Sequence, residues 1–155
     1  MKKLLLLLNN KIPPPVVTFI SAFVIYLSRN LFPNHAGIII DILSVLLLIC
    51  GIIMIRIAFL SFKNHQTTIN PLNLTKTSSL VNTGIFKYTR NPMYLGMIFI
   101  LLSIALKFNL YGGLIVLFLF FSFITKFQII PEEKAMEKLF GQEFKNYKKT
   151  TRRWL

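Results

Sequence analysis

The chain has 155 residues, of which 54% are apolar and 15% are charged, and its formal net charge at pH 7 is +13. The length fits one domain, and the apolar content argues against a water-soluble globule. A single cysteine, Cys50, excludes a disulfide framework and a cysteine-based zinc site within the chain, and the two separated histidines, His35 and His65, give no expectation of a metal centre.

Two apolar runs in the first half predict membrane-spanning helices. A hydrocarbon core of about 30 Å takes about twenty helical residues, and residues 14–32 and 37–62 provide such runs. The turn formers Pro33 and Gly37 lie between them, so we expect an antiparallel pair. The opening "MKKLLLLL" is too short for the core of a signal peptide, and we expect it to lie at the membrane interface as part of the mature chain.

The second half predicts two further spans, residues 92–110 and 112–130, joined by a tight "NLYGG" hairpin. The segment from His65 to Lys87 is different, because it is polar, rich in threonine and asparagine, and lacks a helical period. Loops of this length in a compact domain tend to be functional or disordered. We expect a functional loop, since it leads directly into the motif "RNPMYLG".

The segment "PEEKAMEKLFGQEFKNYKK" predicts an amphipathic helix on the cytoplasmic membrane interface. Its apolar side chains recur at helical spacing: Met136, Leu139, Phe140, Phe144 and Tyr147. We expect Gly141 to bend or interrupt the helix. The predicted fold is therefore all-α, a single integral-membrane domain over residues 1–155 with four transmembrane helices and a C-terminal amphipathic interfacial helix.

The basic residues are distributed unevenly over the four predicted spans. All lysines and arginines except Arg29 and Lys107 fall on one side, which the positive-inside rule places in the cytoplasm together with both termini. Attraction to anionic headgroups explains this charge better than a nucleic-acid site, because no nucleic-acid-binding module accompanies it.

The motif "RNPMYLG" has the features of a helix start at a membrane boundary. Asn91 is a favourable N-cap and Pro92 suits the first helical position, with Arg90 able to reach phosphate headgroups. The same helix start offers free N–H groups as a seat for an anionic part of a ligand. Tyr94 lies in the first turn, and Gly96 leaves room for a neighbouring helix or a flat ligand.

Four of the five carboxylates follow the fourth span, and the pair Glu132 and Glu133 comes directly after Pro131. In the first turn of a helix, two glutamates compensate the helix dipole by about 0.3 to 1 kcal/mol each. The functional alternative is a carboxylate at the membrane edge that binds a cationic or hydroxyl-rich ligand. Composition alone leaves both interpretations open.

Together the two segments resemble a known family. "LVNTGIFKYTRNPMYLG" is similar to the "LVTSGPYRYVRHPMYLG" pattern of the isoprenylcysteine carboxyl methyltransferase family and its phospholipid N-methyltransferase relatives. "PEEKAMEKLFGQEFKNYKKTTRRWL" resembles their carboxyl-terminal pattern of paired glutamates, "FG.EY..Y" and "V.RW". The resemblance covers about residues 67–155 and implies an S-adenosylmethionine-dependent methyltransferase acting on an apolar or lipid-like acceptor.

The resemblance also implies a donor pocket between the last spans and the final helix, with a lipid-side entrance for the acceptor. The implied donor-binding residues are Leu80, Val81, Phe86, Asn91, Pro92, Met93, Tyr94 and Glu133. Glu133 is preferred to Glu132 because its distance to Phe140 and Gly141 matches the family's binding glutamate. We take Arg90 and Tyr94 as the candidate catalytic residues, and methyl transfer from a sulfonium needs alignment and exclusion of water rather than a metal.

Departures from the family pattern narrow the range of possible acceptors. Asn91 replaces a common histidine, and Ile129 stands where the prenylcysteine enzymes carry an arginine for the substrate carboxylate. Lys126 is an imperfect substitute because it lacks the planar fork of arginine. Lys126 and Ile129 are thus the candidate acceptor-binding positions, and a lipid amine, hydroxyl, thiol or other apolar acceptor remains open. The alternatives are an NADPH-dependent enzyme like the membrane sterol reductases and a non-enzymatic scaffold or lipid-binding protein.

Overall fold

The structure is a computed structural model that describes residues 12–32, 37–65 and 79–155. All secondary-structure elements in these ranges are helices or helical turns, and none of them is a strand. The expectations for "MKKLLLLL", for the short loop that contains His35 and for most of the polar loop after His65 lie outside the described residues.

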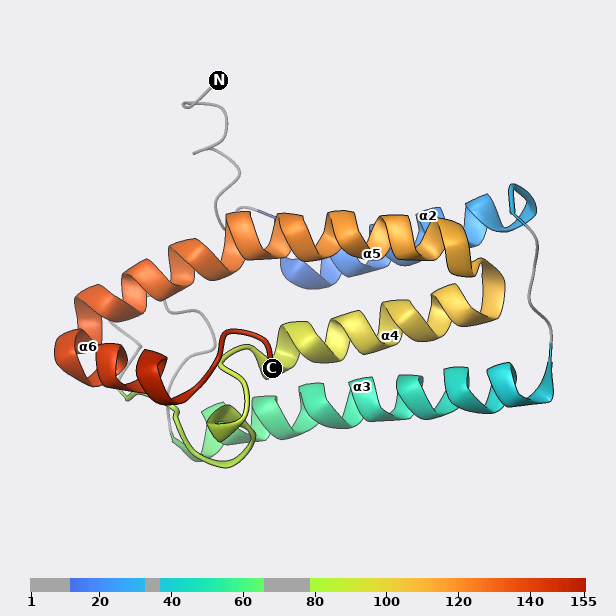
Figure 1. Cartoon of the computed structure of the whole chain (residues 1–155). Helices are drawn as coiled ribbons and strands as arrows, with labels where there is room; N and C mark the ends of the chain where they lie inside the picture. Colours follow the sequence, from blue (N-terminus) through green and yellow to red (C-terminus); the bar gives the residue numbers. More distant parts are fainter. Residues whose placement is uncertain (1–11, 33–36, 66–78) are drawn as a thin grey trace, which may run out of the picture.

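Four long helices lie alongside one another in an up-and-down arrangement (Figure 1). They are α2 (Pro14–Leu27), α3 (Ile38–Asn64), α4 (Pro92–Phe108) and α5 (Leu110–Ile124), and a short 3₁₀ turn, η1 (Ser28–Asn30), follows α2. Helix α4 is central, since it packs against α2, α3 and α5. Two prolines begin their helices as predicted, Pro14 in α2 and Pro92 in α4.

Helix α5 continues without a break into the final helix. A π-helical turn, η3 (Thr125–Ile129), joins α5 to α6 (Ile130–Thr150). The chain then bends at Gly141, whose φ of 50° lies in the left-handed region that favours glycine. The predicted bend is therefore confirmed, and it turns the end of α6 back toward the start of α4 (Figure 1).

The apolar face of α6 packs against protein. Phe144 and Tyr147 are buried with Leu80, Val81 and Phe86 in a cluster beside the end of α3. The expectation of a helix resting on the membrane interface is thus replaced, for this face, by a helix that closes one end of the bundle. Its first turn carries Glu132 and Glu133, as the sequence predicts.

Among the described residues, two helical segments are long and apolar enough to cross a membrane, Ile38–Asn64 and the continuous Leu110–Thr150. Helix α4 is apolar but has 17 residues, and α2 has 14. Length and composition thus support two of the four predicted spans. Large apolar side chains of α2, α3 and α5 are exposed along the outside of the bundle, as a lipid-facing surface would be.

Two glycines set the spacing between α3 and α4. A Cβ added to Gly96 would lie 2.7 Å from the carbonyl oxygen of Gly51, and one added to Gly51 would lie 2.6 Å from that of Gly96. The helices therefore approach more closely than side chains would allow. The expectation that Gly96 admits a neighbouring helix is confirmed.

Candidate functional site

The candidate site lies where the start of α4 meets the first turn of α6. A 3₁₀ turn, η2 (Gly84–Lys87), leads into Thr89, Arg90 and Asn91, which precede Pro92. The hydroxyl of Tyr147 on α6 donates to the carbonyl of Phe86 at 2.6 Å, and this bond holds η2 against the final helix. Two segments far apart in the sequence are thereby fixed together.

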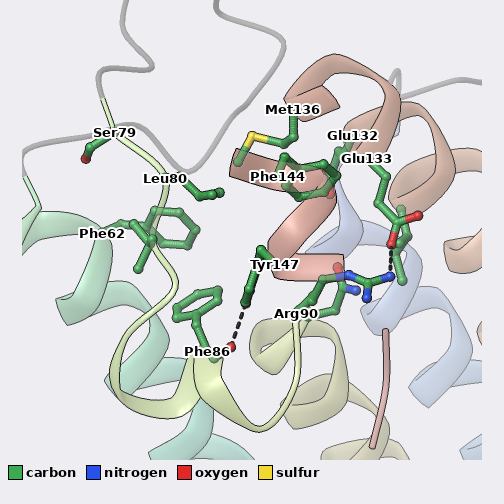
Figure 2. Close-up of a pocket in the computed structure, with 13 residues that line it drawn as sticks. Phe62, Ser79, Leu80, Phe86, Arg90, Glu132, Glu133, Met136, Phe144 and Tyr147 are labelled. Carbon is green, nitrogen blue, oxygen red and sulfur yellow. Dashed lines mark hydrogen bonds and ion pairs between the residues drawn. The ribbon is translucent and has the colours of Figure 1, made fainter. Parts of the chain in front are cut away.

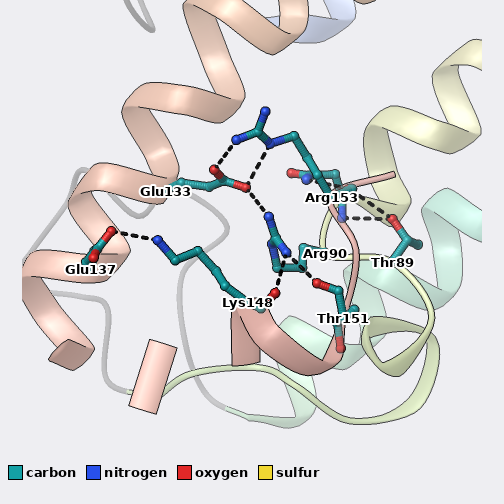
Figure 3. Close-up of polar contacts among 8 residues, drawn as sticks. Thr89, Arg90, Glu133, Glu137, Lys148, Thr151 and Arg153 are labelled. Atoms are coloured by element: carbon teal, nitrogen blue, oxygen red, sulfur yellow. Dashed lines mark hydrogen bonds and ion pairs between the residues drawn. The ribbon is translucent and has the colours of Figure 1, made fainter. Parts of the chain in front are cut away.

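The C-terminal tail runs beside the motif (Figure 3). The N–H of Arg90 donates to the carbonyl of Arg152 at 3.0 Å, and the Thr89 hydroxyl and the Asn91 amide donate to the carbonyl of Arg153 at 3.3 and 2.9 Å. The indole ring of Trp154 stacks on Phe121 with a centroid distance of 4.7 Å. The tail is thus packed against α5 as well as against the motif.

The predicted side-chain cap of α4 is wrong. Asn91 precedes Pro92 as an N-cap should, but its side chain makes no capping hydrogen bond. The reason is the tail, because the Asn91 amide is held by the carbonyl of Arg153. The backbone still begins the helix normally, with the N–H of Leu95 donating to the Asn91 carbonyl at 3.0 Å.

Glu133 is the centre of a network with two arginines (Figure 3). Its Oε1 accepts from Arg90 at 2.7 Å and from Arg153 at 3.1 Å, while its Oε2 accepts from Arg153 at 2.7 Å. Burial by itself would raise the pKa of Glu133, but the hydrogen bonds from Arg153 and Arg90 outweigh it and lower the pKa below its usual value. Glu133 is therefore ionised and held rigidly.

Arg90 is bound on several sides. Its guanidinium also donates to the carbonyl of Thr151 and, at 3.5 Å, to that of Lys148. Its side chain is 10% exposed, and its Nε is buried without a hydrogen-bond partner among the described residues. A buried donor of this kind costs free energy unless an acceptor reaches it. The expectation that Arg90 binds phosphate headgroups is thus replaced by an internal ion pair.

Glu132 has a different environment from Glu133. The Tyr94 hydroxyl donates to its Oε1 at 2.7 Å, and Oε2 has no partner within the described part of the chain. Burial raises the pKa of Glu132 to about 7, the hydrogen bond from Tyr94 lowers it, and the charge of Glu133 raises it. Two adjacent carboxyl groups therefore titrate in different pH ranges.

A smaller pocket lies between the loop before η2 and helix α6 (Figure 2). Its volume is about 90 Å³, and apolar and aromatic side chains form most of its wall. It is lined by Phe62, Ser79, Leu80, Val81, Phe86, Arg90, Asn91, Ile129, Glu132, Glu133, Met136, Phe144 and Tyr147.

A larger pocket lies between the start of α2, the end of α3 and the start of α4. Its volume is about 640 Å³, within the 300 to 1,000 Å³ range of small-molecule sites. It is lined by Pro13, Pro14, Pro15, Phe59, Phe62, Phe86, Arg90, Asn91, Pro92, Met93, Tyr94, Met97, Gln128 and Glu132. The two pockets share five wall residues: Phe62, Phe86, Arg90, Asn91 and Glu132.

The structure brings the expected donor-binding residues together. Leu80, Val81 and Glu133 line the smaller pocket, while Phe86 and Asn91 line both. The remaining three, Pro92, Met93 and Tyr94, line the larger pocket. Of the candidate catalytic residues, Arg90 faces both pockets and Tyr94 the larger one.

The two candidate acceptor-binding residues are separated. Ile129 is fully buried and lines the smaller pocket. Lys126 lines neither pocket, and its Nζ lies 5.5 Å from the ring centroid of Phe127. Only one of the two is therefore placed next to either pocket.

Several residues of the site were not predicted from the sequence. Gln128 is 2% exposed, faces the larger pocket and donates to the carbonyl of Ile12 at 2.9 Å. The only sequence feature that distinguished Gln128 was its position as a polar residue inside the apolar run "FQII". Arg153, the second partner of Glu133, stands in the "RRW" ending, where its charge was attributed to headgroup attraction. Phe59 and Phe62 had no signal beyond their apolar character.

The fold and the site define a helical, membrane-type protein with a polar-edged double pocket at one end of its bundle. The sequence pattern of the phospholipid methyltransferase family matches residues 39–143, which is more than half of the chain. The chain belongs to this family, and the family places it among the methyltransferases. An uncharacterized protein of Haemophilus influenzae is 38% identical over 63 residues, which are 41% of this chain and the full length of that protein. No solved structure matches the chain.

Proposed function

We propose that the protein is an integral-membrane, S-adenosylmethionine-dependent methyltransferase that acts on an apolar or lipid-like acceptor. The observation that carries the proposal is the pair of pockets that share a wall at Arg90, Asn91 and Glu132. Every residue that the resemblance assigns to the donor lines one of them. Membership of the phospholipid methyltransferase family supports a methyltransferase over a sterol-reductase-like enzyme.

The residues around Arg90 and the smaller pocket fit an amino-acid-bearing nucleoside. The unpaired Nε of Arg90 and the free N–H groups at the start of α4 suit a carboxylate. Glu133 supplies a fixed negative charge beside the aromatic wall of the smaller pocket. We assign Leu80, Val81 and Phe86 to the nucleoside, because apolar and aromatic walls are typical of such sites. S-adenosylmethionine, when bound, supplies an electrophilic methyl group on a sulfonium.

We assign the acceptor to the larger pocket, which the expected donor-binding residues Pro92, Met93 and Tyr94 also line, so that donor and acceptor meet there. Its wall combines Pro13–Pro15, Phe59 and Met97 with the polar ends of Tyr94, Gln128 and Glu132. Such a wall suits an apolar body with one polar, reacting end. The pocket holds one basic side chain among the described residues, Arg90, which Glu133 already neutralises. With Arg90 paired to Glu133 and its Nε assigned to the donor, a prenylcysteine carboxylate meets no further cation among the described residues of this pocket, and Lys126 does not line it.

The chain itself positions the reacting groups. The ion pairs of Glu133 fix the start of α4 relative to α6, and such alignment is a main source of rate in a transfer reaction. We propose that α2, α3, α4 and α5 all cross the membrane, with both termini cytoplasmic, so that the pockets lie near the cytoplasmic membrane surface. In this topology the exposed apolar faces of α2 and α3 contact lipid.

Calorimetry on the full chain in detergent tests the proposal. We expect S-adenosylmethionine and S-adenosylhomocysteine to bind, and Glu133→Gln to weaken that binding by at least tenfold, since it removes the charge that holds both arginines. Glu143→Gln is the matched control, because Glu143 is exposed on the same helix. Absence of heat with either ligand at about 1 mM, together with heat from NADPH, would instead support a reductase.

A further inference from the structure

Glu132 differs from the other described carboxyl groups in lining both pockets. Glu133 reaches the smaller pocket only, and two arginines occupy both of its oxygens. Glu132 uses one oxygen for Tyr94 and keeps Oε2 without a partner in the described structure. The carboxyl group at the junction of the two pockets is thus the one with a free acceptor atom.

We propose that Glu132 takes the proton that the acceptor loses on methylation, which makes the acceptor a hydroxyl, thiol or ammonium rather than a carboxylate. This inference rests on the proposed function. It is independent of the assignment of Glu133 to the donor.

The surroundings of Glu132 support this role. The titratable groups that line the two pockets with it are Arg90, Tyr94, Glu133 and Tyr147. Arg90 is committed to Glu133, and Tyr147 donates to the Phe86 carbonyl, so neither is free to take a proton from an acceptor. The pKa of Glu132, raised to about 7 mainly by burial, suits a base that works near neutral pH.

The step balances in atoms and charge. The proton of the acceptor moves to Oε2 of Glu132, and the electron pair it leaves on the acceptor atom forms the new bond to the methyl carbon. The bond between that carbon and sulfur breaks with its electron pair on sulfur, which turns the sulfonium into a neutral thioether. One positive charge is lost at sulfur, and one negative charge is lost at Glu132. The protonated carboxyl then returns its proton to water.

The hydrogen bond from Tyr94 allows a second test of Glu132 as the proton acceptor. It stabilises the ionised form of Glu132 and lowers its pKa against the effect of burial. Tyr94→Phe removes that bond while it keeps the ring. The variant is therefore expected to move the titration of Glu132 to higher pH, which loss of packing alone would not do.

The test uses the full chain in detergent, tritiated S-adenosylmethionine and solubilised total membrane lipid as the acceptor probe. We expect Glu132→Gln to bind the donor within about threefold of the wild type by calorimetry, yet to transfer methyl at least 100-fold more slowly, the lower end of general-base effects. The wild-type rate is expected to rise with pH to a plateau above about 7. Tyr94→Phe is expected to shift that rise upward, and Glu143→Gln is expected to leave it unchanged.

Two readouts are independent of the rate. Infrared difference spectra between pH 5 and 9 are expected to show a carboxyl band that titrates near pH 7 and is missing in Glu132→Gln. The labelled product is expected to survive alkali, because only a methyl ester would release volatile methanol. A base-labile product, or a Glu132→Gln variant with the wild-type rate and pH profile, would overturn the role of Glu132. A wild type that binds no donor would overturn the proposed function itself.

Discussion

Arg90 and Glu133 lie 43 positions apart in the sequence, and their side chains are joined by an ion pair of 2.7 Å. Both are largely shielded from solvent, with exposed side-chain fractions of 10% and 14%. This pair connects the start of α4 to the first turn of α6; Arg90 lines both pockets and Glu133 the smaller one. The pair has a structural role, and we propose that the same two residues also take part in donor binding.

Replacing Arg90 by methionine is expected to lower the free energy of unfolding by about 3 kcal/mol, because it leaves a buried carboxylate with one partner where it had two. The measurement is denaturant unfolding in detergent, followed by circular dichroism. Lys107→Met is the control, since the pair of Lys107 with Asp41 is exposed (50% and 45%) and worth less than about 1 kcal/mol. Equal losses in the two variants would contradict the structural importance of the Arg90 pair.

Deleting residues 152–155 is expected to weaken S-adenosylmethionine binding by at least tenfold. The deletion removes the carbonyl acceptors of Thr89, Arg90 and Asn91, together with the second partner of Glu133. The start of α4 would then lose its alignment with the pockets. Calorimetry measures the effect, and deletion of the exposed Leu155 alone is the control. Full affinity in the longer deletion would show that the tail does not position the motif.

The sequence predicted the helices well because each is an apolar run begun by a proline or followed by a turn. It also placed Glu132 and Glu133 correctly in the first turn of α6. The early end of α2 was not predictable, because it depends on a distant residue. Ser28 bonds back to the Ile25 carbonyl and is itself held by the amide of Asn109 at 3.0 Å.

The continuity of α5 and α6 was also missed. Pro131 lacks an N–H and its ring clashes with the preceding turn of a regular α-helix, so the sequence favours a break there. The structure places a π-helical turn, Thr125–Ile129, just before it. This change of register lets the helix continue. The pairing of Glu133 with Arg153 and of Tyr94 with Glu132 likewise depends on tertiary contacts that no local pattern specifies.

Gly96→Ala is expected to destabilise the protein by about 1 to 3 kcal/mol, in the range of overpacked cores. The new Cβ would lie 2.7 Å from the Gly51 carbonyl oxygen and equally close to Cγ1 of Ile55, so α3 and α4 must move apart. Thermal unfolding in detergent checks the change. Gly37→Ala is the control, because a Cβ there meets no atom within 4 Å. A stable Gly96→Ala variant would mean that the two helices are less closely packed.

Both termini are predicted to be cytoplasmic. The prediction follows from four crossings and from the excess of basic residues at the end of the bundle that carries the pockets, where Lys145, Lys149 and Arg152 are exposed. Reporter fusions at each end, active only on one side of the membrane, measure the topology. Termini on opposite sides would leave an odd number of crossings and would contradict the assignment of either α2 or α4 as a span.

Stability is expected to fall as pH rises from about 4.5 to 7. The pKa of Glu132 is raised from 4.5 to about 7 in the folded protein, mainly by burial. Below pH 4.5 both the folded and the unfolded states hold the proton. Between pH 4.5 and 7 only the folded state keeps the proton on Glu132, so ionisation in the unfolded state favours unfolding increasingly as the pH rises. Above pH 7 both states are ionised, and the loss of folding free energy has reached its full value of up to about 3 kcal/mol.

Glu132→Gln should remove this dependence, because an amide does not titrate. The pKa of Glu133 is lowered, so its contribution is present above about pH 4.5 and is lost only as the pH falls further. Unfolding measured between pH 5 and 8 therefore isolates Glu132. If wild type and Glu132→Gln lost stability in parallel across that range, Glu132 would be ionised throughout in the folded protein, and the free oxygen at the pocket junction would belong to an ordinary carboxylate.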